Sequence, residues 1–329
     1  MMQRISIAIG AGLAAALLFA VMAKGTLLAM MLAYLAPLPI MIATLGWGLD
    51  MGALAGAIAG VVAAVLVDPL SGGLFAVTIA LPAWLLSFTA VLPRQTLYPH
   101  PHVAAANGEK TWFPVGGIVA VAALIGGLVG AGVLASVILA YGGYQKGVES
   151  IVAELVPNLR DAFDGVMTLP SGVSIEDFAA MIVRLSPAVL AATTCLMFCA
   201  NLYAGARAVQ LSQRLKRPWP NLPEGLVLPQ FLGVGLIACA GVALSLRGSG
   251  GYAAWIGVGA LGCAYVMQGL AVVHSLSRGL PVRIPMLIAF YLGCMVTARW
   301  SLPAIALVGL VESLLSLRAR RAAAANVKS

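Results

Sequence analysis

The stretch from Tyr34 to Ile40 is the part of this sequence best suited to form a ligand site within an apolar run. It reads YLAPLPI, and Pro37 and Pro39 each remove a backbone N–H donor, which breaks a helix. Interrupted spans expose backbone groups that must line a buried or wet cavity, and in transporters such breaks mark substrate sites. A simple kink or a helix end is the alternative.

Three further side chains are candidates for the same site. Trp47 follows the proline pair closely, and Asn201 and Gln268 are polar positions inside uncharged runs. An amide at such a position bonds either a ligand or a neighbouring helix, and the sequence does not separate these uses. The candidate ligand-binding residues are therefore Tyr34, Pro37, Pro39, Trp47, Asn201 and Gln268.

Glu312 is the clearest ionisable residue inside a predicted span. Charge at membrane depth is costly, so an intramembrane carboxylate is a functional candidate by default. Arg318 follows closely in the sequence, and an ion pair near the inner membrane surface is the alternative.

Small residues recur every four positions in several runs. In the first run they are Gly12, Ala16 and Ala20. Such faces let helix backbones approach closely, because lipid supplies no hydrophobic drive between helices. Packing inside the bundle is one use of this face, and docking of a partner subunit is the other.

Motifs for catalysis or metal binding are missing from the sequence. It contains no P-loop, HExxH or GxSxG motif, and its GxGxxG match at 257–262 lies within an uncharged run instead of after a strand. Cys195 and Cys199 share a helix face, and His100 and His102 lie in a Pro-containing loop, but neither pair has further ligands nearby. We therefore expect no enzyme activity, no cofactor and no metal.

The composition is that of a membrane protein in contact with the lipid bilayer. Of the 329 residues, 61% are hydrophobic and 9% charged, with a mean hydropathy of +1.01. A soluble domain carries about 25% charged residues. A disordered chain, a secreted disulfide scaffold and a soluble nucleic-acid binder are excluded, because none of them could keep so few charges in water.

Uncharged runs predict the membrane spans. A spanning helix needs about 17 to 25 apolar residues, and these runs are apolar on every face, unlike barrel strands. The ten runs are 5–23, 25–49, 51–67, 69–92, 111–145, 185–206, 225–246, 248–277, 284–298 and 300–317. We predict an all-α polytopic transmembrane bundle of nine or ten spans. The alternative for the last two runs is one long tilted helix.

Basic residues predict the orientation. With ten spans and a cytoplasmic N-terminus, thirteen of the nineteen Lys and Arg residues lie inside and six outside. This favours an orientation with both termini cytoplasmic. The resulting single integral membrane domain has spans 1 to 4 in 1–92, a cytoplasmic loop at 93–114, span 5 at 115–141, an extracytoplasmic segment at 142–184, span 6 at 185–206, a basic cytoplasmic loop at 207–228, spans 7 to 10 in 229–317 and a basic tail at 318–329.

The outer segment 142–184 is acidic and amphipathic. Its apolar residues recur at spacings of three and four, which predicts two helices, and Ser174 with Asp177 forms a potential capping box for the second. Both helices could lie in the interfacial plane with the apolar side down. Alternatively they form a lid over an outward-facing pocket.

The chain resembles the YybS-like family of bacterial membrane proteins, a domain of unknown function. The residues that carry the resemblance are the early small-residue spans, the APLPI stretch at 36–40 leading to Gly46 and Gly48, and the closing RWSLPAIALVGLVESLLSLRAR at 299–320. The resemblance covers most of the chain.

That family looks distantly similar to the substrate-binding S components of energy-coupling-factor transporters. The resemblance implies a ligand pocket near the outer side and a docking face for the energising subunit at Gly12, Ala16 and Ala20. The chain departs from the pattern, because it has more spans than an S component, and the acidic 142–184 segment and the last four spans have no counterpart.

We therefore expect a small-molecule-binding or permease subunit of a transporter energised by partner ATPase and coupling subunits. The YLAPLPI stretch and a lid over 145–184 would form the ligand site. A structural or assembly protein of the cell envelope, without a transported ligand, is the alternative.

Overall fold

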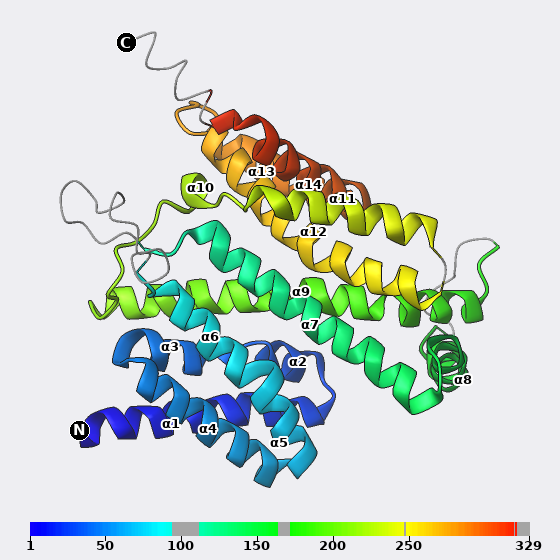
Figure 1. Cartoon of the computed structure of the whole chain (residues 1–329), viewed down its shortest axis with the longest axis horizontal. Coiled ribbons are helices and arrows are strands. Elements are labelled where there is room, and N and C mark those ends of the chain that lie inside the picture. The colour runs from blue at the N-terminus through cyan, green and yellow to red at the C-terminus, as the bar shows by residue number, and fades with distance from the viewer. Residues whose placement is uncertain (94–111, 164–171, 247, 319, 321–329) are drawn as a thin grey trace. The chain divides into compact units, whose positions relative to one another are not determined.

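Helices make up nearly all of the structure (Figure 1). The computed structural model describes residues 1–93, 112–163, 172–246, 248–318 and 320. Within these residues the sole β-structure is an isolated bridge between Pro93 and Trp112. The predicted all-α fold is therefore confirmed.

The chain divides into two compact units, residues Met1–Ala122 with Leu196–Val227 (unit 1) and Ala123–Cys195 with Leu228–Ser329 (unit 2). Unit 1 contains α1 (Met2–Ala20), η1 (Val21–Lys24), α2 (Leu27–Ala33), α3 (Pro37–Trp47), α4 (Leu49–Leu66), α5 (Pro69–Phe75), η2 (Ala76–Ala80), α6 (Leu81–Ala90) and α10 (Leu222–Gly225). Unit 2 contains α8 (Tyr144–Phe163), α11 (Gln230–Ser245), α12 (Ser249–Leu276), α13 (Arg283–Val296) and α14 (Ala298–Leu315). Helices α7 (Val115–Tyr141) and α9 (Ile175–Leu211) contribute residues to both units.

Each of the ten predicted runs contains helix, and eight helical stretches of the described chain are long and apolar enough to cross a membrane. These are Met2–Lys24, Leu27–Trp47, Leu49–Leu66, Pro69–Ala90, Val115–Tyr141, Ile175–Leu211, Ser249–Leu276 and Ala298–Leu315. Helices α11 and α13 are also apolar but have 16 and 14 residues, or about 24 and 21 Å of helix. Because α13 and α14 are separate helices, the alternative of a single helix over the last two runs is wrong.

Small residues let the helices of unit 1 approach closely. Along the contact of α1 with α4, a Cβ atom added at Gly12 would lie 2.7 Å from the Ala55 carbonyl oxygen and 2.9 Å from the Ile58 side chain. Ala16 is fully buried, whereas Ala20 is half-buried. Gly12 and Ala16 are thus covered inside unit 1, and the docking role of this face stays a prediction.

Glycines perform the same function in unit 2. A Cβ atom added at Gly126 of α7 would collide with the Ala191 carbonyl of α9, and one added at Gly259 of α12 would collide with the Ala188 carbonyl. Helices α12 and α14 meet in the same way, where Gly309 lies against the Tyr265 carbonyl. Backbone contact of this kind replaces the hydrophobic drive that lipid does not provide.

Of the two helices predicted in the outer segment, the first forms a separate helix, α8. Val148 belongs to a buried cluster built from α7, α8, α9 and α12, and Ile151, Val152 and Leu155 are partly buried against it. Figure 1 shows α8 nearly end-on, so that it crosses the end of α7 instead of running along it. The placement of α8 at the membrane surface or as a lid stays a prediction.

The second predicted helix is the first part of α9, which continues without a break to Leu211. The helix has 37 residues, or about 55 Å, and is longer than the bilayer core. The Ser174 hydroxyl accepts the Asp177 N–H at 3.0 Å and donates to the Asp177 carboxylate at 2.8 Å. The serine cap is therefore present, but the carboxylate bonds the hydroxyl instead of the backbone of Ser174.

Pro187 lies inside α9 without ending it. Proline cannot donate to the carbonyl four residues earlier, which here is Val183. The Ser186 hydroxyl donates to that carbonyl at 2.9 Å and takes the place of the missing bond. This local repair explains why the predicted boundary at residues 184 and 185 is not a helix boundary.

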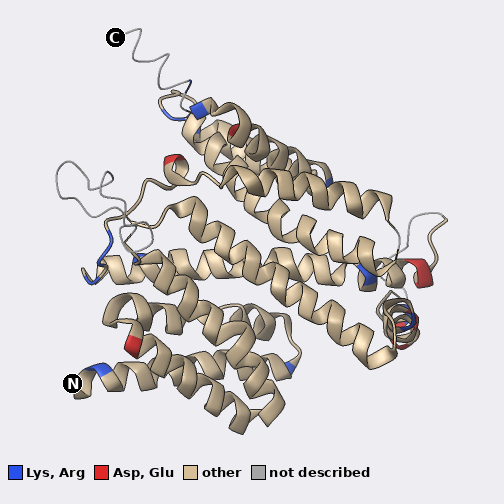
Figure 2. Ribbon diagram, in the orientation of Figure 1, with Lys and Arg blue, Asp and Glu red and all other residues tan. Residues whose placement is uncertain are grey.

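Charged side chains lie near the helix ends in each unit and leave the middle portions apolar (Figure 2). In unit 1, Arg4 pairs with Asp50 at 3.0 Å at the start of α4. In unit 2, acidic residues lie on α8 and the start of α9 and at Glu312 near the end of α14, and Arg160 pairs with Glu176 at 3.2 Å. This distribution is the one expected of membrane helices.

We predict that Gly126→Ala lowers the thermal stability of the detergent-solubilised protein, because the new methyl group collides with the Ala191 carbonyl. Overpacking of this kind costs about 1–3 kcal/mol. Gly132→Ala on the same helix is the matched control, since a Cβ there meets no heavy atom within 4 Å. Differential scanning fluorimetry of both variants tests this, and equal melting temperatures would contradict close packing of α7 on α9.

Candidate functional site

The YLAPLPI stretch forms a tight turn between α2 and α3. The Leu38 N–H bonds the Leu35 carbonyl at 3.0 Å, and the Ala36 N–H bonds the Ala33 carbonyl at 3.0 Å. In a regular helix, Leu38 would instead bond the carbonyl of Tyr34. The proline-induced turn therefore leaves the Tyr34 carbonyl without its helical partner.

Asn201 of α9 supplies the missing partner within unit 1. Its side chain is 3% exposed, and its Nδ2 donates to the Tyr34 carbonyl and to the Met197 carbonyl, each at 2.8 Å. Its Oδ1 atom is buried and has no hydrogen-bond partner among the described residues. The structure thus brings Tyr34, the buried Pro37 and Asn201 together, in a contact that closes the helix break.

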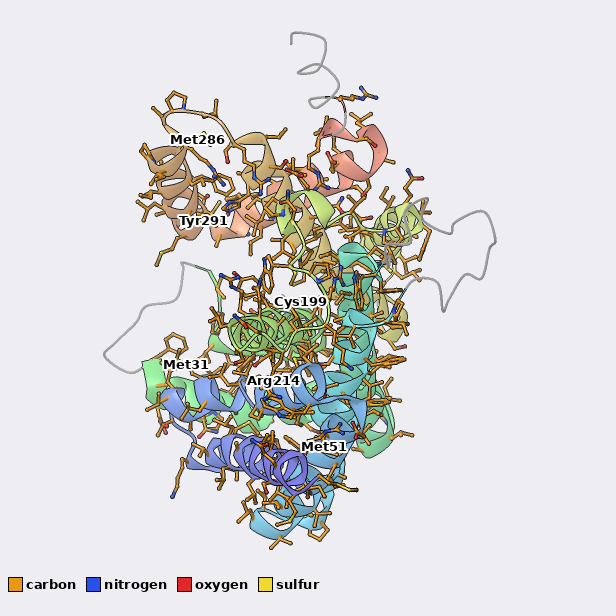
Figure 3. All side chains as sticks on the ribbon, turned by 90° about the vertical axis from the view of Figure 1, so that its left-hand side faces the viewer. Met31, Met51, Cys199, Arg214, Met286 and Tyr291 are labelled. Atoms are coloured by element: carbon orange, nitrogen blue, oxygen red, sulfur yellow. The ribbon has the colours of Figure 1, made fainter. Side chains whose placement is uncertain are left out.

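Trp47 lies at the far end of α3, about 15 Å of helix from Pro37. Its carbonyl accepts a bond from Arg4 Nη2 at 2.6 Å, and the Arg214 guanidinium lies 5.0 Å from the centre of its ring. Figure 3 labels Arg214, which follows the C-terminal end of α9. Trp47 therefore belongs to a basic and aromatic helix end, and it does not complete a site with Pro37 and Pro39.

Gln268 belongs to unit 2 and is fully buried. Its Oε1 accepts the Leu228 N–H at 2.6 Å, and its Nε2 donates to the Gly309 carbonyl at 2.6 Å and the Ser313 hydroxyl at 2.8 Å. Both donor hydrogens of the amide are used within the protein. Gln268 ties α12 to α14 and to the segment before α11.

Glu312 forms an ion pair with Arg318. From the sequence, this pair is the alternative to a functional role for Glu312 within the membrane. Arg318 Nε lies 2.8 Å from Glu312 Oε1, and the two side chains are 8% and 5% exposed. Ser316 adopts a left-handed conformation with φ 49°, which turns the chain after α14 so that the Arg318 N–H also faces the carboxylate at 3.3 Å. A further functional role for Glu312 stays a prediction.

A cavity of about 310 Å³ lies in unit 2, beside the C-terminal end of α11 and the N-terminal end of α12. It is lined by Gln145, Arg184, Leu246, Gly248, Gly251, Tyr252 and Trp255. These residues come from the start of α8, from α9, and from the junction of α11 with α12. They combine a cation, an amide and two aromatic rings, which is the mixture typical of a small-molecule site.

Arg184 is the charged group of this cavity. Its Nε atom is buried and has no hydrogen-bond partner among the described residues. Its carbonyl accepts a bond from the Tyr144 hydroxyl at 3.3 Å, and the Tyr144 ring packs on that of Tyr252 with centroids 4.6 Å apart. The backbone around Arg184 is thus held in place by aromatic packing, while its side chain keeps a donor available.

A second cavity, of about 260 Å³, lies in unit 1 between α4 and the η2–α6 stretch. Its lining is small and apolar apart from Trp84, whose Nε1 already donates to the Leu49 carbonyl at 2.9 Å. It therefore has fewer polar and charged groups for binding a ligand than the cavity lined by Arg184.

Sequence reasoning counted Arg184 only as a charge of an outer loop. Two signals could have found the site, namely the GSGGY stretch at 248–252 and a single arginine just before the apolar run 185–206. Gln145 and Arg184, the first and last residues of the predicted lid, both line the cavity. Among the described residues no group of three His, Cys, Asp or Glu could hold a metal, and His100 and His102 lie outside them.

A family model described as "Predicted membrane protein (DUF2232)" matches residues 105–313. The chain belongs to this family. The match contains every lining residue of the cavity in unit 2, as well as Asn201, Gln268 and Glu312, whereas Tyr34, Pro37 and Pro39 lie before it.

Neither a search of curated proteins nor a search of solved structures found a match to the chain. Membership of the DUF2232 family makes this chain a multi-pass membrane protein, in agreement with its helices. The distant similarity to energy-coupling-factor S components stays a prediction.

We predict that Glu312→Gln destabilises unit 2, because it removes the carboxylate charge that pairs with the buried Arg318 guanidinium. Removing one partner of a buried pair costs about 3–5 kcal/mol. Asp50→Asn is the control, because its pair with Arg4 is 58% and 50% exposed and is worth at most about 1 kcal/mol. Thermal unfolding and membrane yield of both variants are compared, and equal stability would argue against a structural pair at Glu312.

We predict that ionisation of the Tyr144 phenol lowers the stability of the folded protein in alkali. Burial raises its pKa to about 12 from the ordinary 10.0, helped by Tyr252 and opposed by the positive charge of Arg184. The stabilisation is therefore complete below pH 10 and is lost as the pH rises from about 10 to about 12. Tyr144→Phe should remove this part of the loss in melting temperature, whereas Tyr203→Phe, at a 52% exposed ring, should not.

Proposed function

We propose that this DUF2232 protein is a small-molecule-binding or permease subunit of a bacterial inner-membrane transport system. Its ligand site is the cavity lined by Arg184, Tyr252 and Trp255. The observation that carries the proposal is this cavity, because a donor-bearing cation and two aromatic rings converge there in a volume of about 310 Å³. Small-molecule sites of about 300–1,000 Å³ have this kind of lining.

The charge distribution supports an outward-facing cavity. Arg278, Arg283 and the Glu312–Arg318 pair lie at the helix ends of unit 2 opposite to Gly248 and Leu246. Cytoplasmic loops carry the excess of Lys and Arg, so this basic end is cytoplasmic and the cavity faces the outside. We propose that both termini are cytoplasmic, as the distribution of Lys and Arg along the sequence favours.

Energy for transport comes from partner subunits in this proposal. The sequence has no nucleotide-binding motif of its own, and we propose that a partner ATPase and a coupling protein supply the work. Gly12 and Ala16 are covered by α4, and a partner could use that face only if α4 moved away.

A structural or assembly role in the cell envelope is the second candidate, and α13 favours it. No residue of α13 is buried, although the helix is apolar, and His274 Nε2 of α12 lies 2.7 Å from the Tyr291 hydroxyl of α13. Figure 3 labels Met286 and Tyr291 of this helix. Another membrane protein covering α13 would explain this exposure.

The test is purification of the full chain from its host in mild detergent, followed by mass spectrometry of retained small molecules and proteins. We expect a retained metabolite together with stoichiometric ATPase and coupling subunits. Trp255→Ala should lose the metabolite, because it removes a cavity wall, whereas Trp300→Ala, at a 74% exposed ring, should keep it. Envelope-assembly proteins without metabolite or ATPase would support the second candidate instead.

A further inference from the structure

The first turn of α12 presents bare backbone to the cavity in unit 2. The sequence there is Gly-Ser-Gly-Gly at 248–251, and Gly248 and Gly251 line the cavity. Gly248 is the N-cap, with φ 81° and no side chain to cap the helix. The first N–H groups of a helix lack intrahelical acceptors and carry partial positive charge, so this end of a 28-residue helix attracts anions.

Glycine is required at both lining positions. Gly248 has a left-handed φ that side chains rarely adopt, and a Cβ at Gly251 would collide with the Leu246 carbonyl. Gly251 thus serves the close packing of the α11–α12 junction, whereas a Cβ at Gly248 would meet no heavy atom within 4 Å, so the open backbone lies at Gly248.

Arg184 adds a second, independent anion-binding element to the same cavity. Its guanidinium is always charged, and its buried Nε–H has no acceptor among the described residues. Arg184 as a whole is half-buried and lines the cavity, so its guanidinium charge attracts a carboxylate or phosphate group bound there. The N-terminus of α12 and Arg184 therefore both favour a negatively charged group on the ligand.

The remaining walls indicate the rest of the ligand. Tyr252 and Trp255 lie three residues apart on α12 and so share a helix face, and both line the cavity together with Leu246. Gln145 Nε2 is held by Glu149 at 3.1 Å, which leaves the Gln145 carbonyl oxygen to accept a bond. This lining favours a ligand whose uncharged part is flat and largely apolar.

Building on the proposed function, we infer that the ligand of this cavity is a small organic anion. Its carboxylate or phosphate group lies between the N-terminus of α12 and Arg184, and its apolar body contacts Tyr252 and Trp255. The same chemistry is offered by a soluble metabolite and by the phosphate headgroup of a lipid, and the experiment must separate these sources.

The experiment uses the full chain in phosphatidylcholine nanodiscs and a matched set of probes. Phenylacetate, phenyl phosphate, neutral phenylacetamide and cationic 2-phenylethylamine differ mainly in the charged group. We expect the two anions alone to raise the melting temperature at millimolar concentration. Arg184→Gln should weaken their binding at least about tenfold, through loss of a charge-assisted hydrogen bond.

Arg160→Gln is the matched control, because Arg160 is an exposed arginine of α8 that pairs with Glu176, and it should leave anion binding unchanged. Arg184→Lys keeps the charge and should retain part of the binding. The comparison among probes needs no variant, so it remains decisive if Arg184→Gln fails to fold.

Equal shifts from all four probes, or anion binding that Arg184→Gln leaves intact, would overturn the anion inference while the proposed binding function stands. No shift from any probe would count against both. Adding phosphatidylglycerol to the nanodiscs identifies the source: competition with phenylacetate supports a lipid headgroup as the anion, and undiminished phenylacetate binding supports a soluble one.

Discussion

Every polar group inside an apolar helical bundle needs a partner from the protein, and this requirement governs the structure. The Tyr34 carbonyl, freed by the proline turn, is bonded by Asn201, and the Val183 carbonyl, freed by Pro187, is bonded by Ser186. Without water at membrane depth, an unmade bond costs several kcal/mol, on the order of the whole contribution of a helix contact. Prolines therefore persist in these spans because nearby side chains replace the missing bonds.

Four buried polar atoms have no partner among the described residues, namely Asn201 Oδ1, Tyr265 Oη, Arg283 Nε and Arg184 Nε, and of these four residues Arg184 lines the cavity in unit 2. Arg184 Nε has no acceptor among the described residues, and the glycine-rich start of α12 has no side-chain cap. Buried polar groups of Gln268 and Glu312 are, in contrast, engaged by neighbouring helices. Gln268 and Glu312 thus hold helices together, whereas Arg184 lines a cavity in which we propose that a ligand binds.

The family match agrees with this separation. It covers residues 105–313, which include the whole cavity lining but not the α2–α3 turn at 34–36. Asn201 bonds the Tyr34 carbonyl at the turn, and α3 packs on α9 at Gly205, so the polar group freed at the turn is already used in holding unit 1 together. The cavity lined by Arg184, Tyr252 and Trp255 is therefore a better candidate ligand site than the turn before Pro37 and Pro39.

The sequence by itself determined the class of fold and the helices, because hydrophobic length and scarcity of charge act locally and leave few alternatives for a chain in lipid. It also indicated that Glu312 could pair with Arg318, which is close in sequence. Tertiary structure alone decided that Gly12 faces Ala55 and that Asn201 reaches Tyr34. It also decided that Gln145, Arg184 and Tyr252 share a cavity. These contacts join residues far apart in the chain, and apolar runs without charge carry no periodic signal that says which face meets which neighbour.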